Sequence, residues 1–381
     1  MIAGRVPATA FVIASLVVAC VTSPTPSRTP AGSPTAGAVA TIDPAEGWQL
    51  ASLPDGSRAV MFSDVVAGPD GFLVAGGGGP IGNTPIILHS QDGQSWSSEP
   101  ISGSFAAPFG LVTVGARVFA AGGGETNRCA HPAALTTWAR DISGGWQEAP
   151  FDDMFCAGIG NVTMFEFDSH IVLAGAGTGD QPFYMTSEDG LRWTDAGPNP
   201  FGDIYPRAFL AFDKDLWIFG SAPAGVPVVV HRTAGKPFGP PVAIAGLAAD
   251  SDLIAAMWLD GPVVVASAGR ATGILRPDGT GSWVGIPAVG LPPDQIAGIH
   301  VVNGHLVALG ATEADMPEAW TSADGANWRS VVLPEQAVTG SGFTGVAVIG
   351  GTAVLVGQRD APNGSGAVGA IWTGPASLLA P

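Results

Sequence analysis

The sequence predicts an all-β fold, a seven-bladed β-propeller made of four-stranded blades. Its 381 residues include 55 Gly and 33 Pro, which interrupt helices and punctuate turns, so many short strands are favoured. An aromatic residue recurs at intervals of 45 to 50 residues, at Trp48, Trp96, Trp146, Trp193, Phe238, Trp283 and Trp328. Repeats of about 45 residues that each hold four strands are typical of propeller blades.

The N-terminal segment, residues 1–19, is expected to be an export signal that is not part of the fold. Arg5 precedes an apolar run at 8–19, and a run of about a dozen residues is too short to cross a bilayer as a mature helix. The run ends Leu16-Val17-Val18-Ala19-Cys20, which resembles the lipobox of bacterial lipoproteins. The resemblance implies cleavage before Cys20 and a lipid on its sulfur. The alternative is an ordinary secretory peptide with an incidental Cys.

The next segment, residues 20–41, is predicted to be a tether that begins with the lipidated Cys20. It is rich in Thr, Ser, Pro, Ala and Gly, a composition that cannot bury a core and stays extended. A lipid followed by a tether anchors a domain to a membrane without spanning it. We therefore expect residues 42–381 to form the propeller, held at the extracytoplasmic face of a bacterial cell membrane.

A second landmark, an apolar run that ends in small residues, marks the second strand of each repeat. It occurs at 71–77, 117–123, 170–175, 215–220, 261–266, 304–310 and 351–357. In the first repeat, turns at Pro69-Asp70-Gly71 and Asp92-Gly93 delimit the expected strands. These strands are expected at 60–67, 72–75, 86–90 and 96–99.

The two ends of the repeat region are predicted to close the ring together. The last repeat, residues 343–373, holds three strands, whereas residues 48–53 have the pattern of an isolated fourth strand. Pairing this segment with the last blade covers a sheet edge that is otherwise free. The alternative is an open array of six blades with an irregular seventh.

A short turn, Ser-x-Asp-Gly-x-x-Trp, occurs three times before the aromatic landmark. Its copies are Ser90, Asp92, Gly93 and Trp96; Ser187, Asp189, Gly190 and Trp193; and Ser322, Asp324, Gly325 and Trp328. A fourth copy at 277–283 lacks the Ser. The motif resembles the Asp-box of BNR-repeat proteins, the sialidase-type propellers, although it is one residue shorter than their Ser-x-Asp-x-Gly-x-Thr-Trp form.

These turns are expected to be structural. An Asp side chain can accept backbone N–H bonds within a turn, and Gly supplies a positive φ. The large Trp ring can then pack between blades. The carboxylates recur once per blade on the face opposite the usual binding face of such propellers, so catalysis by Asp92, Asp189 or Asp324 is not expected.

The two cysteines of the repeat region, Cys129 and Cys156, are expected to form a disulfide. Cys129 lies between the second and third strands of one repeat, and Cys156 lies in the link to the next repeat. Both kinds of loop emerge on the same face of a propeller, and an exported protein permits oxidation. The alternatives are two free thiols, or a metal site with His131 for which no third and fourth ligand is evident.

That loop-rich face should carry the candidate functional residues. Its polar side chains are Arg58, Glu125, Arg128, His131, Asp152, Asp153, Asp180, Asp203, Tyr205, Arg207, Arg270, Glu313, Asp315, Arg359 and Asp360. The resemblance to sialidases implies a Tyr nucleophile and three arginines that hold a carboxylate, and the candidates are Tyr205 with Arg207, Arg270 and Arg359. The Arg-Ile-Pro motif of that family is absent.

The net charge and the absence of known catalytic motifs reduce the number of function classes that the sequence allows. A formal net charge of −17 opposes nucleic-acid binding, which depends on cationic contacts to phosphate. The sequence holds no phosphate-binding loop, no HExxH and no nucleophile elbow, so we expect no cofactor and no metal. We expect a monomeric, non-enzymatic propeller that binds a glycan, peptide or protein. The alternatives are a sialidase-like glycoside hydrolase or a propeller of the photosystem assembly-factor type.

Overall fold

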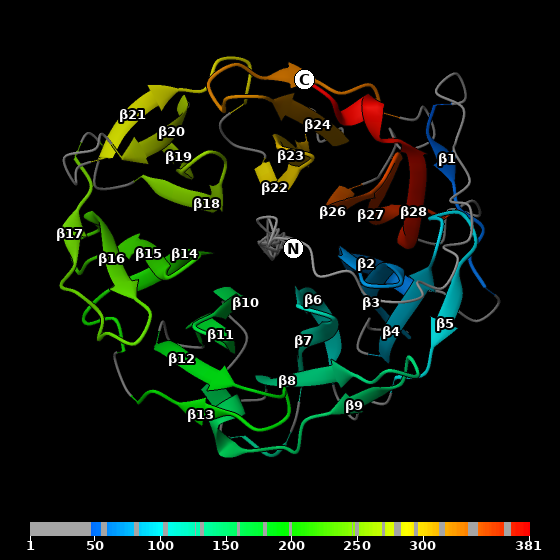
Figure 1. Cartoon of the computed structure of the whole chain (residues 1–381), viewed down its shortest axis with the longest axis horizontal. Helices are drawn as coiled ribbons and strands as arrows, with labels where there is room; N and C mark the ends of the chain where they lie inside the picture. Colours follow the sequence, from blue (N-terminus) through cyan, green and yellow to red (C-terminus); the bar gives the residue numbers. More distant parts are fainter. Residues whose placement is uncertain are drawn as a thin grey trace, which may run out of the picture.

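The computed structural model describes residues 47–54, 59–79, 84–101, 106–125, 127–129, 133–157, 161–177, 181–197, 200–245, 247, 251–268, 271–277, 283–292, 296–311, 317–333, 342–361 and 367–381. Within these ranges the strands form seven four-stranded sheets. The sheets stand around a ring, with their first strands nearest the centre and their fourth strands at the rim (Figure 1). The predicted seven-bladed propeller is confirmed. The predicted signal segment, Cys20 and the tether lie outside the described residues.

Each blade contributes one strand to each of four concentric positions, and the blades are numbered here from β2 onward. The first strands are β2 (Ala59–Gly68), β6 (Ala107–Val114), β10 (Asn161–Phe167), β14 (Tyr205–Phe212), β18 (Asp252–Trp258), β22 (Ile296–Val302) and β26 (Gly342–Ile349). The second strands are β3 (Gly71–Gly78), β7 (Arg117–Glu125), β11 (His170–Ala176), β15 (Asp215–Ser221), β19 (Pro262–Ala268), β23 (His305–Ala311) and β27 (Thr352–Asp360).

The third strands are similar in length to the inner strands, whereas the fourth strands at the rim are short. The third strands are β4 (Thr84–Ser90), β8 (Ala133–Arg140), β12 (Pro182–Ser187), β16 (Pro227–Thr233), β20 (Ala271–Pro277), β24 (Pro317–Ser322) and β28 (Ala367–Pro375). The fourth strands are β5 (Ser97–Glu99), β9 (Trp146–Glu148), β13 (Thr194–Asp195), β17 (Val242–Ala243), β21 (Trp283–Pro287), β25 (Arg329–Ser330) and β1 (Gln49–Leu50). Two short 3₁₀ helices, η2 (Asp153–Ala157) and η4 (Ala376–Leu379), complete the described elements.

Hydrophobic contact between neighbouring blades forms the core. The middle of β3 is buried from Phe72 to Ala75 because both faces of a blade pack against the blades beside it. The inner strands are therefore continuous apolar runs, without the alternation of a one-sided sheet. Between blades three and four, for example, Phe165 stacks on Phe209 with ring centroids 5.6 Å apart.

The N-terminal strand closes the ring as predicted. Gln49 pairs with Thr373 and Leu50 with Trp372, so β1 is the antiparallel fourth strand of blade seven. The backbone N–H of Ala51 donates to the carbonyl of Ile371 at 2.9 Å and extends the pairing by one residue. Segments from the two ends of the described chain thus share one sheet, and the open six-blade alternative is wrong.

A β-bulge interrupts the first strand of six blades at the same position. In β14 the register shifts between Pro206 and Ala208, and β2, β6, β18, β22 and β26 shift at equivalent places, whereas β10 pairs without a shift. Beside the bulge the second strand carries a glycine in five of these six blades and Ala266 in blade five, and blade three has Gly175 at the equivalent place without a bulge. A Cβ on one of these, Gly220, would overlap the carbonyl oxygen of Tyr205. This contact explains why the apolar runs end in small residues.

The Asp-Gly turns have the structural role predicted for them. The hydroxyl of Ser90 donates to Asp92 Oδ1 at 3.1 Å and accepts the N–H of Gly93 at 2.8 Å. The N–H groups of Gln94 and Ser95 also donate to Asp92 Oδ1, at 2.8 and 2.9 Å. The other two copies repeat these bonds, and the three turn glycines have φ between +75° and +78°.

Hydrogen bonds within the turns hold these carboxylates ionised. At Asp324 the backbone N–H and side-chain amide of Asn327 lower the pKa to about 2. At Asp92 and Asp189 partial burial opposes the effect, but the N–H donors outweigh it and the pKa still lies below its usual value. Each carboxylate is occupied within its own turn, which agrees with a structural role.

The aromatic landmarks fasten each turn to the blade before it. The indole N–H of Trp96 donates to the carbonyl of Gly93 at 3.0 Å, and Trp193 and Trp328 make the same bond in their turns. Gly93 itself lies against Val354 and Thr373 of blade seven. Blade four lacks the Asp-Gly motif, yet its Phe238 packs edge-on against Tyr184 of blade three at 5.4 Å.

Helix η4 occupies the place of a turn in blade seven. Thr373 of blade seven donates its hydroxyl to the carbonyl of Gly93 in the turn of blade one. Thr321 has the equivalent position in blade six, and its hydroxyl donates to the carbonyl of Leu379 at 2.7 Å. Because the third and fourth strands of blade seven come from opposite chain ends, no turn joins them, and η4 covers blade six instead.

Candidate functional site at the loop-rich face

The loop-rich face is defined by the links between second and third strands and by the links from blade to blade. Every blade is an antiparallel meander, so all first strands begin at this face and run toward the opposite face. The Asp-Gly turns join third to fourth strands and therefore lie on the opposite face. This separation leaves the loop-rich face free of the repeated structural motif.

Tyr205 and Arg207 form a pair at the loop-rich start of β14. The Arg207 guanidinium carbon lies 4.4 Å from the centroid of the Tyr205 ring, a cation–π contact. Arg207 is exposed and Tyr205 is half-buried. The pair thus presents a flat cationic group, backed by an aromatic ring, at the innermost strand of blade four.

The bulge in β14 determines where this arginine points. Arg207 is the extra residue between Pro206 and Ala208, so it pairs with no residue of β15. Its carbonyl instead accepts the side-chain N–H of Asn161 at 2.7 Å, from the first strand of blade three. The backbone that carries Arg207 is therefore fixed from two blades, while the guanidinium remains open to solvent.

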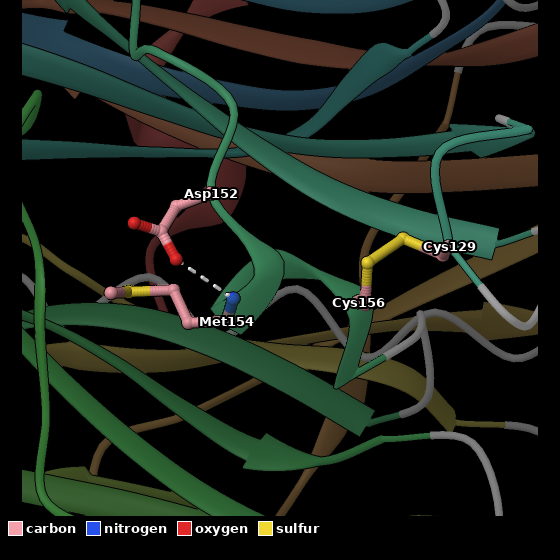
Figure 2. The surroundings of a disulfide bond; sticks show 4 residues. All are labelled: Cys129, Asp152, Met154 and Cys156. Carbon is pink, nitrogen blue, oxygen red and sulfur yellow. Dashed lines mark hydrogen bonds between the residues drawn. A yellow bond between two sulfur atoms is a disulfide. The ribbon is translucent and has the colours of Figure 1, made fainter.

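The predicted disulfide is present on the same face. Cys129 and Cys156 are bonded at an S–S distance of 2.01 Å with their Cα atoms 5.4 Å apart (Figure 2). The bond joins the link between β7 and β8 to η2, which lies in the connection from blade two to blade three. The backbone N–H of Met154 in η2 donates to Asp152 Oδ1 at 3.1 Å (Figure 2).

A second cation–π contact lies beside the disulfide. The Arg128 guanidinium carbon is 5.1 Å from the Phe151 ring centroid, so the residue before Cys129 packs on the connection that carries Cys156. Of the aspartates predicted here, Asp153 is the first residue of η2, and Asp152 precedes it and accepts the N–H of Phe155 through its carbonyl. The link between blades two and three is therefore held by both covalent and polar contacts.

The candidate catalytic constellation is only partly within the described residues. Arg207 belongs to blade four and Arg359 to β27 of blade seven, whereas Arg270 lies outside the described residues. In Figure 1 blades four and seven stand on different sides of the ring. The other loop-face candidates outside the described residues are Arg58, His131, Asp180, Glu313 and Asp315. The sialidase-like assignment of Tyr205, Arg207, Arg270 and Arg359 stays a prediction.

The described loop-face residues form no metal centre. No group of three or more His, Cys, Asp or Glu side chains that could hold a metal ion occurs among the residues that the structure describes. Within the same residues no helix is long and apolar enough to cross a bilayer.

The structure also contains two polar sites that the sequence reasoning missed. Arg140 of blade two forms paired bonds with Glu99 and Asp70 of blade one on the opposite face, with N–O distances of 2.5 to 2.9 Å. The second site is the buried Asp64 of β2, only 1% exposed. The sequence did contain a signal for this site, because Asp64 falls inside the expected inner strand at 60–67. An aspartate is rarely buried in such a strand unless its charge has a partner.

Comparison with known proteins supports the fold. No protein-family description and no curated protein matches this chain. Among solved structures it is similar to YCF48 bound to a D1 peptide, with a TM-score of 0.55 and 12% identity over 87% of this chain and 97% of that chain. These chains share a propeller fold.

Two further similar structures are enzymes. A virginiamycin B lyase from Staphylococcus aureus, solved with quinupristin, gives a TM-score of 0.56 and 12% identity over 85% of this chain and 98% of that chain. An ulvan lyase of polysaccharide lyase family 25 gives a TM-score of 0.51 and 14% identity over 85% of this chain and 93% of that chain. At such identities the similarity extends to the fold, and both binding proteins and lyases are built on it.

Proposed function

We propose that this protein is a membrane-anchored extracytoplasmic propeller that binds a peptide or glycan with an acidic group at its loop-rich face and catalyses no reaction. The observation that carries the proposal is the exposed Arg207 guanidinium stacked on Tyr205 at the start of β14. A planar guanidinium can pair with a carboxylate through two parallel hydrogen bonds, and the aromatic ring offers a surface for an apolar or sugar face.

The surrounding contacts suit a preformed binding surface. Asn161 fixes the Arg207 backbone, and the Cys129–Cys156 bond fastens a neighbouring blade link. A rigid surface loses little conformational entropy when it binds a partner. The peptide in the similar YCF48 structure and the sugar substrate of the similar ulvan lyase illustrate the two ligand classes that we propose to test.

A binding screen with the full-length chain in detergent tests this proposal. Arrays of peptides and glycans should yield an acidic ligand whose affinity falls about tenfold or more in Arg207→Ala, because truncating an Arg that is a binding hot spot costs about 2 kcal/mol or more. Arg192→Ala is the matched control, since Arg192 is an exposed arginine on the opposite face and its loss should leave the affinity unchanged. Equal affinities of wild type and Arg207→Ala would contradict the assigned surface.

The same preparation tests the enzymatic alternative. A panel of fluorogenic glycosides should show no turnover. Hydrolysis by wild type that is abolished in Tyr205→Phe would replace the binding proposal with a sialidase-like one, in which the Tyr205 hydroxyl is the nucleophile.

The membrane anchor is proposed from the lipobox resemblance at Cys20. Replacing the sulfur in Cys20→Ser removes the site of lipid attachment, so we expect the variant to leave the membrane fraction. Fractionation followed by immunoblotting measures this. A Cys20→Ser variant that stays with the membrane as wild type does would refute lipid anchoring through this residue.

A further inference from the structure

A small cavity lies where the first strands of blades one, two and three approach one another. Its volume is about 20 Å³, and it is lined by Asp64, Phe109, Gly110, Leu111, Ala121, Val162, Thr163 and Met164. A cavity of roughly this size holds one water-sized group. Phe109 and Gly110 are half-exposed, so the cavity lies close to the surface on their side.

The Asp64 carboxylate lies in the cavity wall without a counter-charge. Its Oδ1 accepts the N–H of Val65 at 2.8 Å, and its Oδ2 accepts the N–H of Leu111 in blade two at 2.7 Å. No ion pair to Asp64 occurs among the described residues. Each carboxylate oxygen can accept a further hydrogen bond, which leaves capacity for a donor in the cavity.

A second polar group in the cavity wall also lacks a partner. Thr163 is 3% exposed, and within the described part of the chain its hydroxyl makes no hydrogen bond. A buried hydroxyl without a partner costs about 1–3 kcal/mol, so a small polar group in the cavity that bonds to it would be stabilising.

We propose that this cavity is a binding site for one primary ammonium group, held by the Asp64 carboxylate and the Thr163 hydroxyl. An ammonium is about as large as water, it donates hydrogen bonds in several directions, and its charge compensates that of the buried carboxylate. A metal cation fits less well, since sodium-like and calcium-like ions need several more oxygen ligands and the remaining side chains of the wall are apolar. The site is distinct from the Tyr205–Arg207 pair and does not depend on the proposed function.

The protonation state of Asp64 governs binding. Burial raises its pKa to about 7, against the opposing effect of the two N–H bonds. The titratable groups on the surrounding strands line no part of the cavity; they are Arg117 and Glu125 of β7, Glu166 of β10, and Arg359 and Asp360 of β27. Asp64 should therefore be ionised and bind the ammonium at pH 8, and be neutral and bind poorly at pH 5.

Thermal unfolding of the full-length chain in detergent tests the site with methylammonium chloride as the probe. At pH 8, about 100 mM methylammonium should raise the Tm by roughly 1–3 °C above the same concentration of tetramethylammonium chloride, which cannot donate hydrogen bonds. The increase should be absent in Asp64→Asn and smaller in Thr163→Val, which is close to isosteric.

Other results would overturn the assignment. An equal Tm for methylammonium and tetramethylammonium in wild type, or an increase that persists unchanged in Asp64→Asn, would exclude the ammonium site. A larger increase with sodium chloride than with methylammonium chloride would assign the cavity to a metal cation. Because the readout is stability, Asp64→Asn must itself fold, which circular dichroism checks, and Thr163→Val supplies an independent variant that leaves the carboxylate in place.

Discussion

Two buried titratable side chains act in opposite directions on the pH dependence of stability. Asp64 has its pKa raised by burial from 3.8 to about 7. His300 of β22 is 1% exposed, neither ring nitrogen has a partner within the described residues, and burial lowers its pKa from 6.5 to about 4. Both groups are therefore uncharged in the folded protein between about pH 4 and 6.5.

The signs follow from proton uptake on unfolding. Between pH 4 and 7 the folded state holds a proton on Asp64 that the unfolded state releases, so the stability contributed by Asp64 is present at low pH and is lost as pH rises through 7. The unfolded state protonates His300 below pH 6.5 whereas the folded state does not. The stability contributed by His300 is therefore present above 6.5 and is lost as pH falls toward 4.

A matched pair of variants separates the two contributions. Since one pKa unit corresponds to about 1.4 kcal/mol, each group contributes a few kcal/mol across its window, and the two contributions have opposite signs. In Asp64→Asn the free energy of unfolding should fall, relative to wild type, as pH falls from 7 to 4. In His300→Leu it should rise over the same range. Urea unfolding at several pH values measures the free energy of unfolding of each variant. If the difference between variant and wild type did not change with pH, the assigned pKa shifts would be wrong.

At the scale of elements, short segments reinforce the contacts that the strands make between neighbouring blades. The Asp-Gly turns reach back to the preceding blade, and η4 replaces such a turn where the chain ends meet. On the loop-rich face the corresponding contact is covalent, because the Cys129–Cys156 bond fastens η2 to the link between β7 and β8. Turns and η4 therefore link blades on one face, and a disulfide does so between blades two and three on the other.

Loss of the disulfide should weaken the region between blades two and three. The bond closes a chain segment with a sequence separation of 27 residues. In the chain-entropy view such a bond contributes about 3.5 kcal/mol. We expect Cys129→Ser combined with Cys156→Ser to lower the free energy of unfolding by roughly this amount in a urea titration.

A reductant provides the control for this prediction. Dithiothreitol should lower the stability of wild type toward that of the double variant and leave the double variant unchanged. If the double variant were as stable as wild type under oxidising conditions, the disulfide would make no net contribution to the free energy of unfolding.

At the scale of the whole molecule, stability depends on closing the ring. β1 pairs with β28, and the indole N–H of Trp48 donates to the carbonyl of Val332 in blade six at 3.0 Å. The Trp48 ring also lies directly over Gly374, where a Cβ would approach it to 2.8 Å. One residue near the start of the described chain therefore joins the last two blades.

Trp48→Ala tests this closure. Truncating a packed aromatic side chain commonly costs about 3–5 kcal/mol, and here it also exposes part of β28, so we expect a marked fall in Tm. Val242→Ala is the control, because Val242 is 51% exposed on the outer strand of blade four and does not take part in closing the ring. Calorimetry compares the two, and similar small effects of both substitutions would show that the ring does not depend on Trp48.

The repeat, the blade count, the closing strand and the disulfide were all predicted from the sequence and are present in the structure. The reason is that each depends on a local pattern, such as the spacing from Trp283 to Trp328, or on loop positions that the propeller topology fixes. The roles of Asp92, Asp189 and Asp324 were equally predictable, since their hydrogen bonds lie within their own turns.

Contacts between polar residues of different blades became apparent only from the packed structure. The bulge that exposes Arg207 on Tyr205, the bond from Asn161, and the cavity shared by Asp64 and Thr163 each join residues of different repeats or depend on a register shift. Periodicity in a sequence places residues on strands, but it does not give the side-chain distances between neighbouring blades. For that reason the sequence was sufficient for the architecture and for naming Tyr205 and Arg207 as candidates, whereas their contact and the cavity at Asp64 emerged only once the blades were packed together.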